Sequence, residues 1–260
     1  MKIYMYEHFP NFGDALNSYL WPLYFDKWLH RADNVLMFGI GTLLGQKINH
    51  NGRVIVCGSG CGYEADTGAV EKNWKIFFVR GPRTANILGL PAEVAITDPA
   101  ILTSECFPKS PPSSRVAFIP HWETSANPLW RKACSLADID YIDPLASVPE
   151  VVSAISAAKM VITEAMHGAI IADSYRVPFI PVSTSARINN FKWQDWTESL
   201  SINFVIENLS FLGVSDVFRT ITADRKTSKY LRKVLPNKST EVKPEKICWP
   251  LSVVNMLYLH

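Results

Sequence analysis

The sequence contains no uninterrupted apolar stretch that approaches the roughly 18 residues required by a membrane-spanning helix. Its first residues, MKIYMYEHFPNFGD, also lack the apolar core of a secretory signal. Charged residues make up only 19% of the 260-residue chain, and the formal net charge of +2 is too small to indicate nucleic-acid binding. With 48% hydrophobic residues, the chain can bury a substantial core. We therefore expect a soluble, globular protein of the cytoplasm with no nucleic-acid partner.

Paired cysteines are also missing. The five cysteines include no Cys-x-x-Cys spacing and leave an odd residue over, which favours free thiols in a reducing compartment over a disulfide framework. Cys57 and Cys61 are separated by GSG, which predicts a turn, and no second pair of metal ligands follows. We therefore expect no metal site.

The first part of the chain alternates short apolar segments with Gly-rich turns and helical patterns. The predicted strands are Lys2–Tyr6, Val35–Phe38, Val54–Cys57, Ile76–Val79 and a short one near Glu93–Thr97, and the predicted helices are Ala15–Leu29 and Pro82–Leu88. This alternation favours a parallel, Rossmann-like sheet. The glycines that follow the strands either let the backbone turn or let a ligand approach it closely.

After the Pro- and Ser-rich segment FPKSPPSS (107–114), which predicts a semi-rigid linker, the same alternation resumes. The predicted strands are Arg115–Ile119, Asp140–Ile142, Lys159–Thr163 and Val177–Val182, and the predicted helices cover 128–137, 147–158, 166–175, 199–218, 222–235 and 252–258. Ser147 and Glu150 have the spacing of a capping box. We predict an α/β protein with two Rossmann-like domains, residues 1–108 and 114–260. This architecture resembles the GT-B glycosyltransferases, in which substrates occupy an interdomain cleft.

The strand-to-helix turn around His167 is the main candidate for a chemical centre. Ligands of open α/β sheets bind at the carboxyl ends of strands, beside the positive end of the next helix. Here a titratable imidazole and the Glu164 carboxylate come three residues apart, with Gly168 following the histidine. His121 ends the first strand of the second half in the same kind of position, although a structural histidine stacked on Trp122 is the alternative.

Arginines follow the fourth strand of the first half. Arg80 and Arg83 lie where a helix begins, and cations there oppose the helix dipole unless an anion is bound. The planar guanidinium suits carboxylates and phosphates because it donates two parallel hydrogen bonds. The alternative is a solvated start of a helix.

Two further segments have the composition of ligand-binding surfaces. Asn11, Gly13 and Asp14 form the first loop after a strand, where Asp14 could equally be a helix cap. The segment after Val182 interleaves cations with aromatic side chains, which is typical of sugar and anion surfaces, whereas an amphipathic core edge is the alternative. Its candidate residues are Arg187, Lys192, Asp195, Trp193 and Trp196.

Basic residues outnumber acidic ones from Arg219 to Lys246. A solvated helix face explains such an excess, and so does contact with an anionic membrane leaflet.

Several motifs, taken in order, resemble the polysaccharide pyruvyl transferase family. They are NFGDALN, GIGTLL, VRGPRTANILG, ITDPAIL, FIPHW and TEAMHGAIIADSYRVPFIPV. The resemblance is strongest to the branch that acts on exopolysaccharides such as succinoglycan. It implies a GT-B-like fold and transfer of a carboxyethylidene group from phosphoenolpyruvate, as co-substrate, to a sugar, with no further cofactor. The family's motif has an arginine two residues before the histidine, where this chain has Ala165.

The resemblance and the residues together give a set of expected roles. We expect His167 to act as acid and base with Glu164 orienting it, and His121 to be a second acid/base group. The donor would be held by Arg80, Arg83, Arg187 and Gly168. The sugar acceptor, free or lipid-linked, would lie over Asn11, Gly13, Asp14, Lys192, Trp193 and Trp196. The alternatives are a GT-B glycosyltransferase that uses a nucleotide sugar, and a non-catalytic sugar-binding protein of polysaccharide assembly.

Overall fold

The computed structural model describes residues 1–5, 11–29, 34–45, 50–62, 70–184, 188–202 and 205–209. The described chain divides into two compact units. Residues 1–106 and 189–202 belong to the first unit, and residues 107–188 and 205–209 belong to the second, within these described ranges. Each unit contains one parallel sheet with helices, which confirms the predicted α/β class. The GT-B arrangement and its cleft stay predictions.

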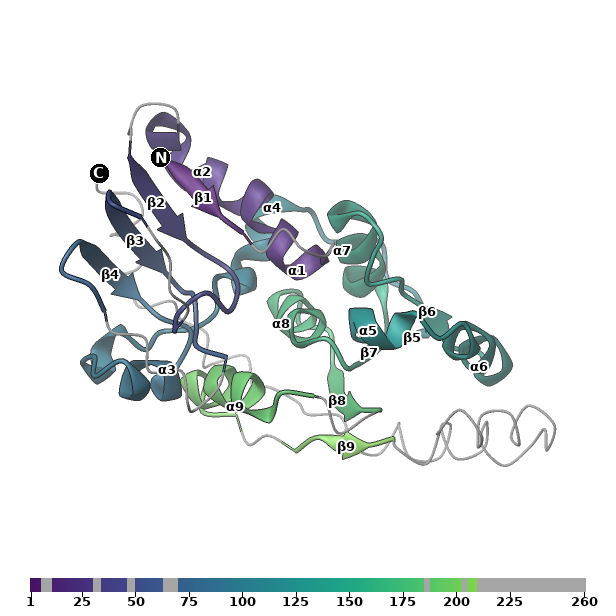
Figure 1. Ribbon diagram of the computed structural model, residues 1–260. Helices are drawn as coiled ribbons and strands as arrows, with labels where there is room; N and C mark the ends of the chain where they lie inside the picture. The colour runs from purple at the N-terminus through teal and green to yellow at the C-terminus, as the bar shows by residue number, and fades with distance from the viewer. Residues whose placement is uncertain are drawn as a thin grey trace. The chain divides into compact units, whose positions relative to one another are not determined.

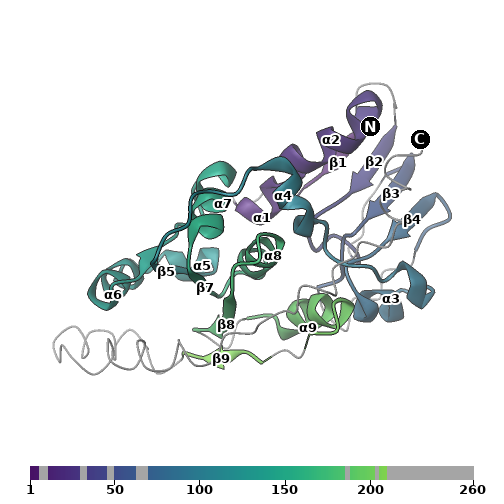
Figure 2. The same ribbon diagram turned by 180° about the vertical axis from the view of Figure 1, so that it is seen from behind.

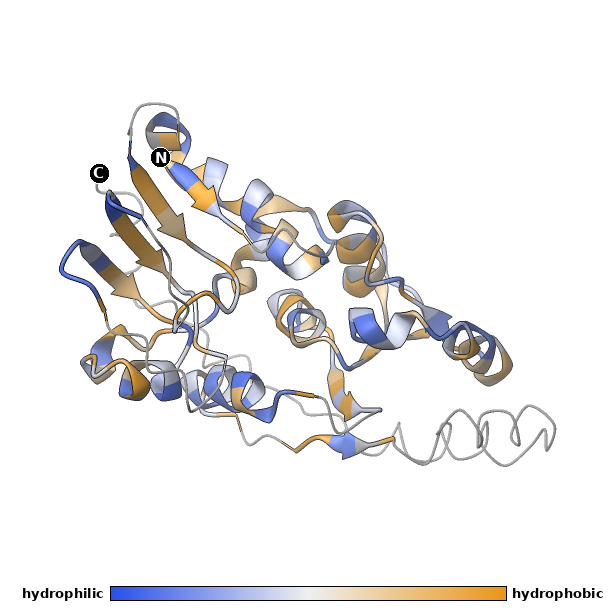
Figure 3. Cartoon of the chain, viewed as in Figure 1, coloured by the Kyte–Doolittle hydropathy of each residue, from blue (hydrophilic) through white to orange (hydrophobic). Residues whose placement is uncertain are grey.

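Within the described ranges, the first unit is built on four parallel strands in the order β1-β2-β3-β4 (Figure 1). Their bounds are β1 (Lys2–Tyr4), β2 (Val35–Phe38), β3 (Arg53–Cys57) and β4 (Trp74–Phe78). β2 and β3 are hydrophobic along most of their length (Figure 3). Phe38, Val54 and Val56 are fully buried in the core of this unit, because both faces of a parallel sheet are normally covered.

Five helices accompany this sheet in the described chain. They are α1 (Phe12–Ala15), α2 (Asn17–Leu29), α3 (Pro82–Ile87), α4 (Thr103–Cys106) and α9 (Asn190–Ser199). The strand predicted near Glu93–Thr97 is wrong, since Ala92–Val94 forms a turn of 3₁₀ helix and Pro99–Leu102 a second one. The Ala95 N–H donates to the Ala92 carbonyl, which curls the backbone and leaves Ala95 only an isolated bridge to Val79.

Helix α9 packs with the first unit, although the sequence placed these residues in the second domain. α3 and α9 lie side by side in both orientations (Figures 1 and 2). Gly81, which caps α3, lies so close to α9 that a Cβ atom there would be 1.9 Å from the Asp195 carbonyl oxygen. The contact depends on residues more than a hundred positions apart, which sequence patterns do not reveal.

The described residues of the second unit form five parallel strands in the order β6-β5-β7-β8-β9. Their bounds are β5 (Val116–Ile119), β6 (Asp140–Tyr141), β7 (Met160–Thr163), β8 (Phe179–Ser183) and β9 (Glu207–Asn208). The chain first adds β6 on one side of β5 and then adds β7 on the other. The strand order therefore reverses between β5 and β7.

The described helices of the second unit are α5 (Trp122–Ser125), α6 (Leu129–Ala137), α7 (Val148–Ala157) and α8 (Met166–Ser174). The capping box of Ser147 and Glu150 at the start of α7 is confirmed. The helix predicted over 199–218 is wrong at Glu207 and Asn208, which pair with β8 as a strand. The helices predicted over 222–235 and 252–258 and the basic segment 219–246 lie outside the described residues.

Within the described ranges, no helix combines the length and the apolar character needed to cross a membrane.

Candidate active site

The carboxyl ends of β5 and β7 form the topological switch point of the second sheet, the place where ligands bind in open α/β folds. Predicted site residues follow both strands. His121 comes two residues after the end of β5, and Glu164 directly follows β7. His167 lies in the first turn of α8, which packs on β7 and β8. The structure therefore brings the three predicted catalytic residues to one edge of one sheet.

Glu164 ties the turns of this edge together. Its Oε2 atom accepts a hydrogen bond from the His121 N–H at 3.1 Å. Its Oε1 atom accepts from the Thr184 N–H at 2.9 Å and from the Thr184 hydroxyl at 2.5 Å. The side chain is buried, at 1% exposed. These donors stabilise a carboxylate that connects the ends of β5, β7 and β8. The prediction that Glu164 orients His167 stays a prediction.

Gly168 is fixed by close packing of α8 on the sheet. A Cβ atom at this position would lie 2.6 Å from the Thr163 hydroxyl oxygen and 2.9 Å from Ile119 Cγ2. The glycine thus lets the first turn of α8 rest on the last residues of β7 and β5. This packing explains Gly168 without a ligand, and its predicted role in donor binding stays untested. Its neighbour His167 is half-buried in the same turn of α8.

His121 is the N-cap residue of α5 and is about one-third exposed, at 36%. Its Nδ1 atom accepts a hydrogen bond from the Glu123 N–H at 3.4 Å, so the neutral ring carries its proton on Nε2. The Glu123 carboxylate lies 3.8 Å from Nδ1, and the ring centroid of Trp122 lies 5.7 Å from that of the imidazole. Trp122 is thus the ring neighbour that the sequence suggested, although the two rings are tilted by 42° and not stacked.

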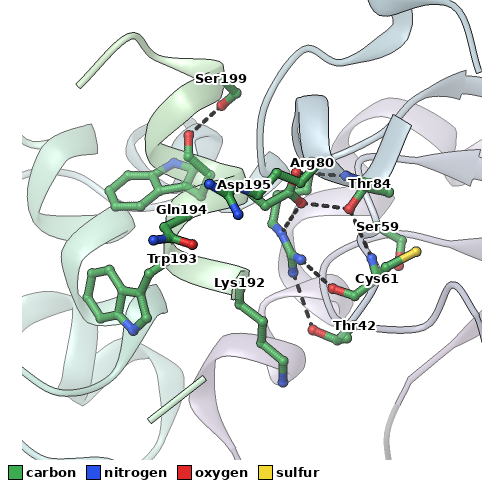
Figure 4. A network of polar contacts seen from close by, with 12 residues as sticks. Thr42, Ser59, Cys61, Arg80, Thr84, Lys192, Trp193, Gln194, Asp195 and Ser199 are labelled. Atoms are coloured by element: carbon green, nitrogen blue, oxygen red, sulfur yellow. Dashed lines mark hydrogen bonds and ion pairs between the residues drawn. The ribbon is translucent and has the colours of Figure 1, made fainter. Parts of the chain in front are cut away.

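Arg80 of the first unit lies at the centre of a buried polar network (Figure 4). Its Nε donates to Asp195 Oδ2 at 3.0 Å. Nη1 donates to the Thr42 hydroxyl at 3.2 Å, and Nη2 donates to the Cys61 carbonyl at 2.6 Å. Asp195 also accepts from the Thr84 N–H at 2.9 Å and from the Thr84 hydroxyl at 2.6 Å. The guanidinium and the carboxylate are both fully buried.

The three arginines predicted to hold the donor have different surroundings. The protein itself occupies the guanidinium of Arg80 on three sides, so the structure explains this residue without an anionic ligand. Arg83 pairs with Glu198 at the surface, donating from both Nε and Nη2. Arg187 lies outside the described residues. No donor-binding cation is thereby fixed in the described part of the chain.

The Gly-rich turns after β2 and β3 are bonded to each other. The N–H groups of Leu44 and Gly60 donate to the carbonyls of Gly60 and Gly41, at 3.2 and 3.0 Å. The Leu43 N–H donates to the Ser59 hydroxyl at 3.3 Å. A phosphate cradle needs free N–H groups that converge on the ligand. These contacts favour the interpretation in which the glycines serve the turns.

The first loop of the first unit is organised by Asn17, which the sequence analysis did not single out. Its amide donates to the carbonyls of Asp14 and Ile40, at 2.9 and 2.8 Å, and its oxygen accepts from the Ile40 N–H at 2.8 Å. Asn11 caps α1 by accepting from Gly13 N–H and also donates to Asp14. Asp14 lies beside Gly41, where a Cβ would be 3.0 Å from Asp14 Oδ1. The signal in the sequence was the position of Asn17 at the end of the NFGDALN motif.

The tryptophans of α9 are core residues. Trp193 is 3% exposed and Trp196 is fully buried, so neither face is available in this structure to stack on a sugar. The alternative of an amphipathic core edge describes these tryptophans better. Lys192 is half-buried and extends from the same helix on the side of Arg80 and Thr42 (Figure 4).

Among the described residues, no group of three or more His, Cys, Asp or Glu side chains is arranged to hold a metal ion.

Together these features define an α/β protein with polar, histidine-bearing strand ends. The model of the polysaccharide pyruvyl transferase family matches residues 11–186, well over half of the sequence, and the chain belongs to this family. The match confirms the resemblance drawn from the motifs. The chain is also similar to the succinoglycan biosynthesis protein ExoV of Rhizobium meliloti (strain 1021), with 37% identity over 213 residues. That similarity covers 78% of this chain and 66% of the relative, slightly under two thirds of its length.

Proposed function

We propose that the protein transfers a carboxyethylidene group from phosphoenolpyruvate to a sugar of a bacterial exopolysaccharide repeat unit and releases phosphate. Membership of the family supports the reaction class, and the relative's name supports a polysaccharide acceptor. The observation that carries the assignment lies at the switch point. There the Glu164 carboxylate accepts a hydrogen bond from the backbone N–H of His121, and the first turn of α8 contains His167.

The reaction forms two C–O bonds to one carbon, the first by addition and the second by displacement of phosphate, which leaves with the proton of the second hydroxyl. An acid delivers a proton to the methylene carbon of phosphoenolpyruvate, which becomes the methyl group. One sugar hydroxyl then adds to the carbon that bears phosphate and gives its proton to a base. A second hydroxyl displaces phosphate from the same carbon, and the ketal closes. The only products are the pyruvate ketal and inorganic phosphate, so the balance requires no oxidant or reductant.

His167 is the proposed acid and base. It lies in the first turn of a nine-residue helix, whose positive end favours an anionic substrate beside it. An imidazole can both donate and accept a proton, as the addition of the first hydroxyl and the displacement of phosphate by the second require. His121 is the proposed second acid/base group, because it follows β5 at the same edge of the sheet and its Nδ1 atom accepts a hydrogen bond from the Glu123 N–H. Glu164 is proposed to hold the backbone turn at His121 beside the turn that contains His167.

Donor binding is assigned first to Arg187. Arg80 and Arg83 already have carboxylate partners in Asp195 and Glu198, so either would have to exchange that partner for the donor. In the sequence, Arg187 follows Thr184 by three residues, and Thr184 directly follows β8. A guanidinium suits the carboxylate and phosphate of phosphoenolpyruvate through paired hydrogen bonds.

The acceptor sugar is proposed to contact the first unit through Asn11, Gly13, Asp14 and Lys192. Short polar side chains and one cation supply hydrogen bonds for sugar hydroxyls. We further propose a cytoplasmic location, with peripheral contact of the basic segment 219–246 at the inner membrane face if the acceptor is lipid-linked.

The test is incubation of the whole protein with phosphoenolpyruvate and an oligosaccharide repeat unit that lacks the ketal. We expect phosphate release together with one carboxyethylidene group added to the sugar, seen by mass spectrometry. His167→Ala should lower the rate about 100- to 10,000-fold, the usual loss when a general acid/base is removed. His50→Ala, a histidine of the first unit, is the matched control and should keep full activity.

Two results would contradict the proposal. Full activity of His167→Ala would remove the histidine from the mechanism. Thermal stabilisation by a nucleoside diphosphate, with none by phosphoenolpyruvate, would instead favour a glycosyltransferase that uses a nucleotide sugar.

A further inference from the structure

The buried pair of Arg80 and Asp195 connects α9 to several turns of the first unit. Arg80 comes directly after the end of the β4 region, and its two Nη atoms reach Thr42 after β2 and Cys61 after β3. Its Nε reaches Asp195 of α9. One guanidinium therefore joins the carboxyl ends of three strands to a helix that is 115 residues further along the chain.

Thr84 completes this connection. Its hydroxyl donates to Asp195 at 2.6 Å and accepts from the Cys61 N–H at 3.0 Å. The same residue thus links α3, α9 and the turn after β3. Arg80 donates to three acceptors and Asp195 accepts from three donors, so the buried groups are tied together in one arrangement.

Two motif glycines are explained by this network. A Cβ atom on Gly60 would lie 2.3 Å from Cζ of Arg80, and a Cβ atom on Gly81 would collide with Asp195. The glycines of GSGCG and RGP thus leave room for the guanidinium and for α9. They are placed for the network rather than for a bound phosphate.

The network also reaches the loop that carries Asp14. Thr42, which accepts from Arg80, follows Gly41, and Gly41 lies against the Asp14 carboxylate. Asn17 bonds the same turn through both backbone groups of Ile40. Displacement of the turn that contains Thr42 would therefore move Gly41 relative to the Asp14 carboxylate.

We propose that Arg80 and Asp195 are positioning residues for the acceptor side of the reaction and do not bind the donor. The pair holds the turn 39–45 against Asp14 and does not itself contact the substrate. This inference rests on the proposed function for its acceptor assignment, and it replaces the donor-clamp role that the sequence suggested for Arg80.

Hydrogen exchange tests the structural half of the inference without any substrate. In Asp195→Asn, one amide N–H must face donors from Arg80 or Thr84, so the network opens. We expect roughly tenfold or faster exchange at the amides of Leu43, Leu44 and Gly60, which lie in the turns and not in α9. Glu198→Gln, which breaks the surface pair of the same two helices, is the control and should leave these amides unchanged. Unchanged exchange in the turns of Asp195→Asn would overturn the proposal.

Kinetics test the functional half. Thr84→Val removes the hydroxyl with little change of shape and keeps the charged pair, so it tests the proposal even if Asp195→Asn folds poorly. We expect a several-fold rise in KM for the acceptor, with KM for phosphoenolpyruvate and kcat near wild type, and recovery in Thr84→Ser. A rise in KM for phosphoenolpyruvate alone would return the network to the donor. A fall in kcat with both KM values unchanged would mean only less folded enzyme, and either result overturns the proposal.

The two proposals fail separately. If the wild-type protein transfers no pyruvyl group, the proposed function fails, whereas the exchange experiment still reports on the network.

Discussion

Glu164 and Thr184 meet through two hydrogen bonds to one carboxylate oxygen, although 20 residues separate them in the sequence. The Thr184 backbone N–H and its hydroxyl both donate to Oε1. Glu150 forms the same pair of bonds with the N–H and hydroxyl of Ser147, at 3.0 and 2.6 Å, on the exposed surface of α7. The molecule thus contains one arrangement twice, once buried and once in solvent.

Glu164→Gln should destabilise the protein by about 1–3 kcal/mol, because a buried amide N–H would face donors from Thr184 or His121 and one of them would lose its acceptor. Urea unfolding followed by tryptophan fluorescence measures the change. Glu150→Gln is the matched control and should change stability far less, because water can satisfy the same groups there. Equal effects of the two substitutions would mean that the Glu164 bonds do not hold the switch point.

Gly168→Ala should destabilise the protein by about 1–3 kcal/mol and lower pyruvyl transfer, because the new methyl group forces α8 away from β7 and β5. Thr163 loses its hydroxyl contact with the Ala165 carbonyl, now 2.7 Å, in the same movement. The double variant Thr163→Ala, Gly168→Ala should recover part of the stability by removing one of the two clashes. If Gly168→Ala is as stable and active as wild type, the close packing of α8 is not needed.

Asp173 should make stability fall as pH rises above its ordinary pKa of 3.8. Burial raises the pKa of this carboxyl, with the nearby Arg176 opposing the change. Its Oδ2 atom has no hydrogen-bond partner within the described structure. The folded state therefore keeps the proton after the unfolded state has released it. The free energy of unfolding consequently decreases over that pH range, and the folded state becomes less stable.

Asp173→Asn should remove this pH dependence while keeping an acceptor for Arg176. The stability of the variant relative to wild type should increase as pH rises from 3.8 through the raised pKa. Urea unfolding of both proteins across this pH range is the measurement. A stability difference that stays constant with pH would contradict a raised pKa.

Three of the described cysteines, Cys57, Cys106 and Cys134, should react slowly in the folded protein. Burial raises the pKa of Cys57 and of Cys134 to about 12, and it raises the pKa of the half-buried Cys106 to about 11. Since the thiolate is the reactive form, little is present near neutral pH. Alkylation mapped by peptide mass spectrometry should modify Cys106 first and the other two only in urea. Rapid native labelling of Cys57 or Cys134 would show that β3 or α6 opens.

The sequence was sufficient for elements that carry a local signal. β2 has the predicted bounds, and the capping box at Ser147 marks the start of α7. The segment at 93–97 has strand-like residues, yet its turn hydrogen bond between Ala92 and Ala95 closes a 3₁₀ helix. The short strand Glu207–Asn208 exists only through its pairing with β8, which local propensity does not encode.

The candidate site shows the same division. His167, Glu164 and His121 could be predicted because strand ends are ligand sites in parallel sheets, and each follows a recognisable strand. The surroundings of Arg80 could not, because its partner Asp195 is 115 residues away and a single sequence gives no sign of the contact. The aromatic segment around Trp193 looked like a sugar surface, since composition alone does not distinguish a ligand face from a buried one.

The path of the chain through α9 also has a consequence for synthesis. A ribosome releases Arg80 and Thr84 well before it makes Asp195, so the first unit has its sheet while its buried cation still lacks a counter-charge. Four of the five strands of the second unit are complete by then. Domains usually fold in the order in which they are made. In this protein the unit that is begun first is finished only after most of the second has been translated, so a truncation before α9 would leave a charged, uncompensated core.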